Sequence, residues 1–337
     1  MKKFIKTLLL QLMAIDSTTG KESSLVEFIC KKFQYAGANV TIQSIPNESG
    51  NVFLKWGDAH PNIIFCTHLD TVFPYIAPIE RLDSVWGRGA CDAKGQIVTM
   101  YTVCTQLFNE GYTNFGLLLL INEESNSLGA KIANELINNC QFMIIGEPTS
   151  NKLIKAANGV ILFDVIAIGK SVHSGYPEYG SNAINHLQQF FNKLTNTDFP
   201  YDKILGKTTY NIGELHSINS VNVISDKAVC KILFRSTFAS HDLIEKKILS
   251  LVDENINISM INKSSPINFF TLPEFETDIV HFGSDAASFT KCGTRLLFGP
   301  GSILSAHSNE EKIEISDIET AVKKLKLLYY RLRGLVC

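Results

Sequence analysis

The 337-residue chain lacks several features that would assign it to particular classes of protein. It has no uninterrupted apolar stretch of the roughly 20 residues that a membrane helix needs. It also has no run of like charges, no internal repeat and no low-complexity segment. Its net charge of -2 gives no general attraction to nucleic acid or to an acidic membrane. We therefore expect a globular protein that binds neither nucleic acid nor membranes.

The eight cysteines form neither a disulfide framework nor a zinc-finger pattern, because none belongs to a Cys-x-x-Cys pair. Several lie inside apolar runs, where a free thiol packs as a small hydrophobic side chain. This usage favours a reducing compartment, so we expect a cytoplasmic protein. The length allows two domains, and 45% hydrophobic with 19% charged residues is ordinary for a globular chain.

The N-terminus resembles the first half of a signal peptide, with Lys2 and Lys3 before an apolar run. However, Gln11 interrupts this run and no small-x-small cleavage site follows. The apolar residues also fall on one stripe of a helix. They are Phe4, Ile5, Leu8, Leu9, Leu12 and Met13. We expect an amphipathic first helix rather than a signal peptide.

Residues 62–72 are the centre of the predicted site. Residues 62–66 are largely β-branched or aromatic and follow Pro61, which is typical of a buried strand. His68 and Asp70 lie at its carboxyl end, where ligands of α/β proteins gather. A neutral imidazole is a good zinc ligand, and a carboxylate can fix its tautomer. A core-edge histidine beside a solvated aspartate would give the same pattern.

Asp92 lies in a glycine-rich segment, just before a helix predicted from Gly95 to Phe108. Glycine lets the backbone approach another group closely, and a carboxylate is favoured near a helix N-terminus. Asp92 is therefore either an ordinary aspartate at the start of the helix or a carboxylate shared by two metal ions.

Two further buried strands are followed by glutamates. Residues 117–121 form an apolar strand that precedes Glu123 and Glu124. Their side chains point differently, because side chains alternate along an extended segment. One can bind a metal while the other acts as a general base. Residues 142–145 form another buried strand, and Glu147 follows it.

Four buried strands are thus expected to end in potential ligands: at His68, near Asp92, at Glu123 and Glu124, and at Glu147. Carboxylates that converge on one edge of a sheet would repel one another unless cations compensated their charge. The pattern therefore predicts more than one metal ion. Histidine and carboxylate ligands without a thiolate suit zinc in a catalytic site, with cobalt or manganese as substitutes.

The order of predicted elements changes over residues 153–266. Strands are predicted at 160–167, 208–215, 228–234 and 256–261, and helices at 181–194 and 243–253. This βαββαβ order is typical of a small ferredoxin-like open-faced sandwich. We therefore expect an α/β protein in which residues 1–152 and 267–337 form one domain and residues 153–266 are inserted in it.

Five motifs carry a resemblance that spans nearly the whole chain. They are Thr67-His68-Leu69-Asp70-Thr71-Val72-Phe73-Pro74, Gly87-Arg88-Gly89-Ala90-Cys91-Asp92-Ala93-Lys94-Gly95, Glu123-Glu124, Gly146-Glu147-Pro148-Thr149 and Ala306-His307. In this order they resemble the dinuclear zinc aminoacylase and exopeptidase family, which includes acetylornithine deacetylase, succinyl-diaminopimelate desuccinylase and glutamate carboxypeptidase. The resemblance implies a zinc-exopeptidase-like mixed sheet flanked by helices. It also implies that the inserted segment is a lid and the dimerisation domain of a homodimer.

The resemblance implies two zinc ions per chain. One would be held by His68, Asp92 and Glu147, and the other by Asp92, Glu124 and His307, so that Asp92 bridges them. Cobalt or manganese can substitute for zinc in such a ligand set.

The resemblance assigns roles to five other residues. Asp70 would orient His68, and Glu123 would be the general base. In the inserted segment, His173 would reach the active site of the neighbouring subunit and stabilise the oxyanion of the reaction. Arg235 would hold the carboxylate of the substrate through a bidentate pair, and Asn222 matches an asparagine of the substrate pocket.

Two positions depart from the pattern of the family. Asn158 stands where several relatives carry arginine, and Ser225 replaces a common proline. The first departure puts the substrate in doubt, because one cationic contact is absent at that position.

The loop from Gly299 to Gly301 and the context of His307 look most like acetylornithine deacetylase. The resemblance therefore implies hydrolysis of the amide bond of an N-acyl amino acid, with N-acetylornithine as the leading substrate, in arginine biosynthesis. A desuccinylase, or a dipeptidase or carboxypeptidase of the same family, is the alternative. A non-catalytic binding protein is disfavoured, because Glu123 and all five ligands are intact.

Overall fold

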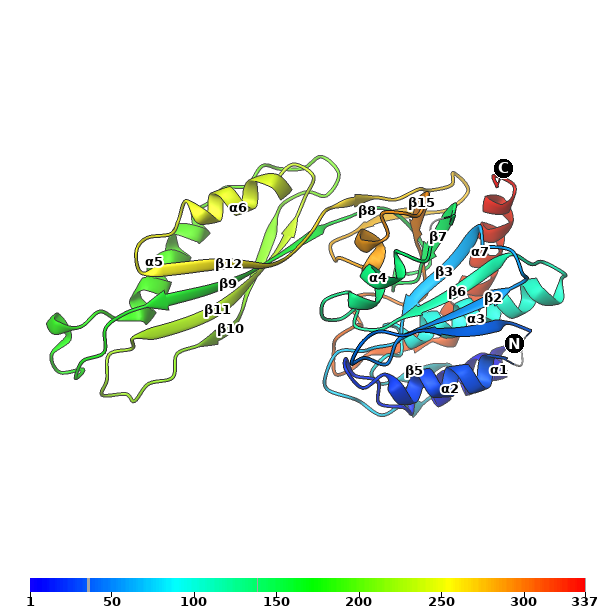
Figure 1. Ribbon diagram of the computed structural model, residues 1–337, viewed down its shortest axis with the longest axis horizontal. Coiled ribbons are helices and arrows are strands. Elements are labelled where there is room, and N and C mark those ends of the chain that lie inside the picture. Colours follow the sequence, from blue (N-terminus) through cyan, green and yellow to red (C-terminus); the bar gives the residue numbers. More distant parts are fainter. Residues whose placement is uncertain (35–36, 138, 337) are drawn as a thin grey trace. The chain divides into compact units, whose positions relative to one another are not determined.

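The structure is a computed structural model that describes residues 1–34, 37–137 and 139–336. The chain folds into two compact units, which are described separately below (Figure 1). The large unit comprises Met1–Lys155, Phe269–Asp278 and Ser284–Cys337. The small unit comprises Ala156–Asn268 and Ile279–Gly283.

The large unit is built on a six-stranded mixed sheet with the order β1-β2-β6-β3-β7-β15. Its strands are β1 (Asn39–Gln43), β2 (Asn51–Trp56), β3 (Ile63–His68), β6 (Phe115–Leu120), β7 (Phe142–Ile145) and β15 (Thr294–Leu297). Strands β6, β3, β7 and β15 run parallel to one another, whereas β1 and β2 are antiparallel to their neighbours. Every residue of β3, β6 and β7 is buried, as expected for parallel strands covered on both faces. The parallel arrangement brings the carboxyl ends of these strands to one edge.

Helices cover this sheet. They are α1 (Lys2–Met13), α2 (Ser23–Phe33), α3 (Lys94–Asn109), α4 (Leu128–Ala133) and α7 (Ile315–Arg333). Helix α3 packs against α1, α7 and the strands β3 and β6. The predicted amphipathic first helix is confirmed, but Phe4 is 46% exposed, so that the buried stripe of α1 begins at Ile5. No helix among the described residues is both long and apolar enough to cross a membrane.

The described residues also form two small three-stranded sheets. One contains β4 (Ile79–Glu80), β5 (Ser84–Trp86) and β16 (Lys312–Glu314), and the other contains β8 (Leu153–Ala157), β13 (Ile267–Asn268) and β14 (Thr277–Val280). The expectation that a buried strand of the main sheet ends near Asp92 is wrong, because the preceding strand, β5, belongs to a small sheet and ends at Trp86. The glycine-rich loop between β5 and α3, rather than a strand of the main sheet, carries Asp92.

The small unit has a four-stranded antiparallel sheet with the order β10-β11-β9-β12 and two helices. Its elements are β9 (Gly159–Ile168), α5 (Ala183–Thr195), β10 (Thr209–His216), β11 (Lys227–Ser236), α6 (His241–Leu249) and β12 (Ile256–Ser264). The predicted βαββαβ order is confirmed. Buried residues alternate along β9 and β11, and this buried face forms a core with apolar residues of α5 and α6.

Candidate metal centre

His68, the last residue of β3, is buried with only 1% exposure. Its Nδ1 lies 3.0 Å from the backbone oxygen of Asp70 and 3.5 Å from the Oδ1 of the same residue. A hydrogen on Nδ1 would leave Nε2 with a free lone pair, and Nε2 faces Oδ1 of Asp92 at 3.1 Å. Neutral His68 can therefore present Nε2 as a metal ligand.

The buried carboxylate of Asp70 holds the segment that follows β6. Its Oδ1 accepts a hydrogen bond from the backbone N–H of Glu123 at 3.0 Å, and its Oδ2 accepts one from the N–H of Glu124 at 3.1 Å. The hydroxyl of Thr19 also donates to Oδ2, at 2.8 Å. Asp70 therefore fixes the backbone of both glutamates in addition to its contact with His68, a function that the sequence motif did not reveal.

Asp92 places its two carboxylate oxygens against two different imidazoles. Oδ1 faces Nε2 of His68 at 3.1 Å, and Oδ2 faces Nε2 of His307 at 3.3 Å. The same nitrogen of His307 lies 3.0 Å from Oε1 of Glu124. A carboxylate with one histidine on each oxygen is the arrangement expected of a ligand shared by two metal ions.

The ligand atoms of His68, Asp92 and Glu124 lie within 4.8 Å of one another. Glu147 follows β7 and is buried. The residue before it is held against β3, because Gly146 donates its N–H to the oxygen of Cys66 at 2.7 Å and accepts a hydrogen bond from the hydroxyl of Thr67 at 2.9 Å. The structure thus brings all five predicted ligands to the large unit.

Three acids of this cluster, Glu123, Glu124 and Glu147, have raised pKa values. Burial raises the pKa of Glu147 well above its usual value, and the nearby charge of Asp92 raises it further. Burial also raises the pKa of Glu123 well above its usual value, with added repulsion from Glu147. Burial and the charge of Asp92 raise the pKa of Glu124. Divalent cations would remove this penalty, so the donor set fits a metal centre.

The two histidines carry the opposite shift. Hydrogen bonds to Asp92 and then to Glu124 raise the pKa of His307 to about 10. Burial opposes the charging of His68, but hydrogen bonds to Asp70 and Asp92 outweigh it and raise its pKa. In the metal-free protein these imidazoles therefore hold protons, which metal binding must release.

Asp285 is a further buried acid of the cluster, whose charge acts on Glu123 and Glu147, and sequence reasoning gave it no role. It begins the short 3₁₀ helix η3 (Asp285–Ser288). Burial raises its pKa to about 7, and its Oδ1 has no hydrogen-bond partner among the described residues. The Gly283-Ser284-Asp285 sequence, which places glycine near an aspartate as around Asp92, was the signal that could have identified it.

The structure places His173, Asn222 and Arg235 in the small unit. The segments of His173 and Asn222 lie side by side, because the N–H of Ser174 donates to the oxygen of Asn222 at 2.8 Å. His173 is exposed, and its Nδ1 accepts a hydrogen bond from the N–H of Gly175 at 3.1 Å. Arg235 lies on β11, opposite Val160 of β9. The roles of these residues in the reaction stay predictions.

Asn158, the first of the two departures from the family pattern, makes hydrogen bonds within the small unit. Its side-chain nitrogen donates to the oxygen of Ser236 at 2.9 Å, and its Oδ1 accepts a hydrogen bond from Nδ1 of His281 at 2.9 Å. Ser225 is also buried and donates to the oxygen of Lys227 at 3.1 Å. Both departures therefore satisfy local hydrogen bonds.

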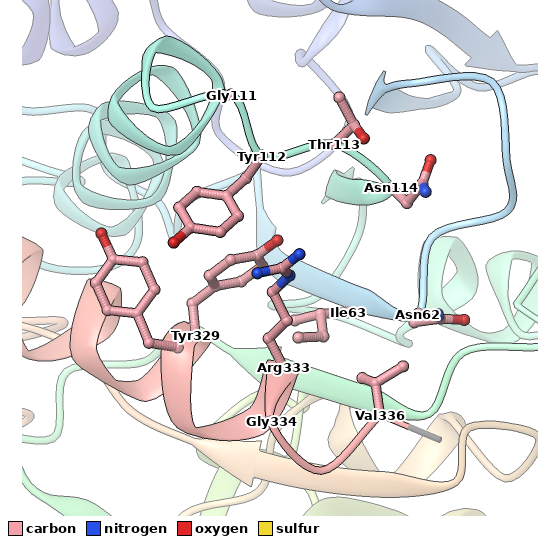
Figure 2. A pocket seen from close by; sticks show the side chains of 11 residues that line it. Asn62, Ile63, Gly111, Tyr112, Thr113, Asn114, Tyr329, Arg333, Gly334 and Val336 are labelled. Atoms are coloured by element: carbon pink, nitrogen blue, oxygen red, sulfur yellow. The ribbon is translucent and has the colours of Figure 1, made fainter.

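A cavity of about 560 Å³ lies at the opposite end of the main sheet (Figure 2). It is lined by Asn62 and Ile63, at the start of β3, and by residues of α7 such as Tyr329 and Arg333. His68 ends the same strand, roughly 17 Å away at the usual rise per residue. None of the described residues that line this cavity has a side-chain carboxylate, and the cavity does not include the candidate metal ligands.

Comparison with known proteins supports a peptidase family. Residues 156–259 match the family model of the peptidase dimerisation domain. A peptidase M20 domain-containing protein of Schizosaccharomyces pombe is 31% identical over 334 residues, which cover 96% of this chain and 83% of that protein. A probable carboxypeptidase of Aspergillus clavatus is 30% identical over 356 residues, which cover 94% of this chain and 86% of that protein.

Solved structures show the same fold. A tripeptidase from Staphylococcus aureus superposes with a TM-score of 0.80 at 20% identity, over 97% of each chain. An M20 family metallo-carboxypeptidase from Sulfolobus solfataricus superposes with a TM-score of 0.78 at 13% identity, over 96% of this chain and 97% of that chain. With the sequence relatives, these likenesses lead to one conclusion: the chain belongs to the M20 peptidase family.

Proposed function

We propose that this chain is a two-metal hydrolase that cleaves the amide bond before a C-terminal amino acid, as a carboxypeptidase or dipeptidase does. The observation that carries the proposal is Asp92, whose two oxygens face His68 and His307 within a cluster of buried carboxylates. The similar protein of Aspergillus clavatus is described as a probable carboxypeptidase, which supports a peptide as substrate.

The residues present fit two divalent ions. His68, Asp92 and Glu147 would hold one of them, and Asp92, Glu124 and His307 would hold the other. Two zinc ions suit this set of nitrogen and oxygen donors, and cobalt or manganese are plausible substitutes. When bound, such ions lower the pKa of water toward about 7 and polarise an amide carbonyl.

Glu123 supplies the base in this proposal. Asp70 fixes its backbone, and the carboxylate of Glu123 is not among the proposed metal ligands, so it is free to take up a proton and return it. The carboxylate of Glu123 accepts the proton of the attacking water and then gives it to the leaving nitrogen. The products are a carboxylate and a free amine.

The small unit completes the proposed site through a homodimer. The match to a peptidase dimerisation domain supports a second copy of the chain as the partner. His173 of one subunit would donate a hydrogen bond to the oxyanion in the other subunit. Arg235 and Asn222 would hold the free carboxylate of the substrate, because a guanidinium pairs with a carboxylate in a bidentate manner.

N-acetylornithine is the second candidate substrate, since the loop from Gly299 to Gly301 looks like that of acetylornithine deacetylase. N-acyl amino acids and peptides share the amide bond next to a free carboxylate, so the same residues would act on either. N-succinyl-diaminopimelate, the substrate of a desuccinylase, differs from N-acetylornithine in both the acyl group and the amino acid. Both sides of the amide bond therefore decide among these activities.

A substrate panel tests the proposal. The protein is purified without chelator, its metal content is measured, and zinc, cobalt or manganese is added. Release of free amine is then followed with dipeptides, tripeptides, N-acetylornithine and N-succinyl-diaminopimelate. We expect two ions per chain and release of the C-terminal residue from peptides. A stoichiometry that never exceeds one ion would reject the two-metal site. Faster cleavage of N-acetylornithine than of every peptide would select the second candidate.

A further inference from the structure

Arg88 and Glu311 form a buried ion pair in the large unit that the proposed function does not use. Nη1 of Arg88 lies 2.7 Å from Oε2 of Glu311, and the two side chains are 2% and 0% exposed. A well-packed apolar pair is often as stable as a buried ion pair, because taking both charges out of water is costly. Stability alone is therefore a poor explanation for the pair. The other hydrogen bonds of the two side chains indicate a second role, because they fix backbone segments next to two proposed ligands.

Glu311 holds the backbone of Asp92. Its Oε1 accepts hydrogen bonds from the N–H groups of Cys91 and Asp92, each at 3.2 Å. Its backbone oxygen accepts a further hydrogen bond from the N–H of Gly87 at 2.8 Å. Glu311 thus fixes the glycine-rich loop at the residue that faces both imidazoles.

Arg88 holds the backbone beside His307. Its Nη1 donates to the oxygen of Ser308 at 3.2 Å, and its Nε donates to the oxygen of Pro74 at 3.2 Å. Among the described contacts, the ring of His307 meets only Asp92 and Glu124, and its side chain is 50% exposed. Packing therefore does little to fix this ring, in contrast to His68 within the sheet.

We propose that Arg88 and Glu311 are positioning residues for the metal that Asp92, Glu124 and His307 would hold. The pair links the backbone of Asp92 to the backbone next to His307, so that both ligands keep their relative position before metal arrives. The inference rests on the proposed function, because positioning matters only if a metal binds. The planar guanidinium is essential, since it contacts a carboxylate and two carbonyls from fixed directions.

Zinc binding to two variants tests this role. Arg88→Lys keeps a positive charge opposite Glu311 but cannot reach both carbonyls. The double variant Arg88→Met with Glu311→Leu leaves no unpaired charge from the ion pair, and its melting temperature verifies that it is folded. Metal-free samples are equilibrated with zinc buffered by chelators, and bound zinc is measured by elemental analysis. We expect both variants to bind the second zinc about 10- to 100-fold more weakly and to lose less affinity for the first, because the described contacts of the pair do not include its other ligands, His68 and Glu147.

Leu325→Ala is the matched control, because Leu325 lies buried in the apolar core on α7 and has no side-chain polar atom that could pair with a proposed ligand. It should lower the melting temperature and leave both zinc affinities unchanged. Wild-type affinity for the second zinc in both Arg88 variants would overturn the inference, as would an equal loss in Leu325→Ala. A wild-type protein that takes up no second zinc would instead reject the proposed function, and the inference with it.

Discussion

The candidate site histidines His68 and His173, one from each unit, have opposite surroundings. In the large unit, His68 is 1% exposed, and both of its ring nitrogens lie within 3.1 Å of an oxygen. In the small unit, His173 is exposed, and its described polar contact is a hydrogen bond from the N–H of Gly175. The neighbours of His68 already indicate metal binding. His173 would acquire a function only from a group outside its own unit, such as a substrate or a second copy of the chain.

The two units also differ in how much charge they bury. The large unit buries several carboxylates near one another, and burial raises the pKa of Glu123, Glu147 and Asp285. The small unit has an ordinary apolar core, in which Phe163 and Phe234 pack edge to face with ring centroids 5.9 Å apart. Destabilising charge is thus concentrated where we propose chemistry, as is common at functional sites.

The largest effect is expected from the base of the large unit. Glu123→Gln keeps the size of the side chain and removes its basicity, so we expect turnover to fall by roughly 10²- to 10⁴-fold. Both metal ions should remain bound, because Glu123 is not a proposed ligand. Turnover on the substrate found in the panel and metal content by elemental analysis measure the two effects.

Glu124→Gln is the matched control for this change, because it alters the neighbouring residue in the same way. It should lose affinity for one metal, since a neutral amide is a weaker ligand than a carboxylate. Near-normal turnover in Glu123→Gln would move the base elsewhere, with Glu124 as the next candidate.

Sequence reasoning succeeded for the elements whose signal is local. Strands β3, β6 and β7 are buried throughout, and each therefore contains an apolar run in the sequence, with polar residues only at the end of β3. Strands β5 and β16 were not predicted, because each has only three residues and β16 pairs with β5 across a long separation in the chain. Their position could be known only from the folded chain.

The same limit applies within the site. The five candidate ligands could be proposed from the sequence because each lies in a short motif, and the structure places them all in the large unit. The hydrogen bonds from Glu123 and Glu124 to Asp70 join residues more than 50 positions apart, and no local pattern indicates them. The lack of a partner for Oδ1 of Asp285 likewise depends on tertiary packing.

The next largest effect is expected from His173, whose proposed partner is the oxyanion in the neighbouring subunit. If His173 stabilises the oxyanion of the neighbouring subunit, His173→Ala should lower turnover by roughly 10²- to 10³-fold, the cost of one lost donor. Mixing inactive Glu123→Gln with inactive His173→Ala should restore activity. A dimer with one chain of each variant contains one site in which both residues are wild type. An equal, fully exchanged mixture should regain up to roughly a quarter of normal activity.

Subunit exchange must be verified by mass measurement of tagged chains. Exchange without recovered activity would show that His173 does not act across subunits. Full activity of His173→Ala alone would remove it from the chemistry altogether.

The smallest effect concerns stability and pH, for which the two units should respond with opposite sign. In the large unit, burial raises the pKa of Asp285 from 3.8 to about 7, so its ionisation disfavours the folded state increasingly as pH rises from about 4 to about 7. In the small unit, burial lowers the pKa of His241 below 6.5, so the folded state loses stability as pH falls below that value.

Melting temperatures of the metal-free wild type and of the variants Asp285→Asn and His241→Gln, between pH 5 and 8, measure both pH dependences. The gain of Asp285→Asn over wild type should grow by a few degrees toward pH 8, and that of His241→Gln should grow toward pH 5. Differences that change with pH in the same direction for both variants would show that the two buried groups do not distinguish the units in this way.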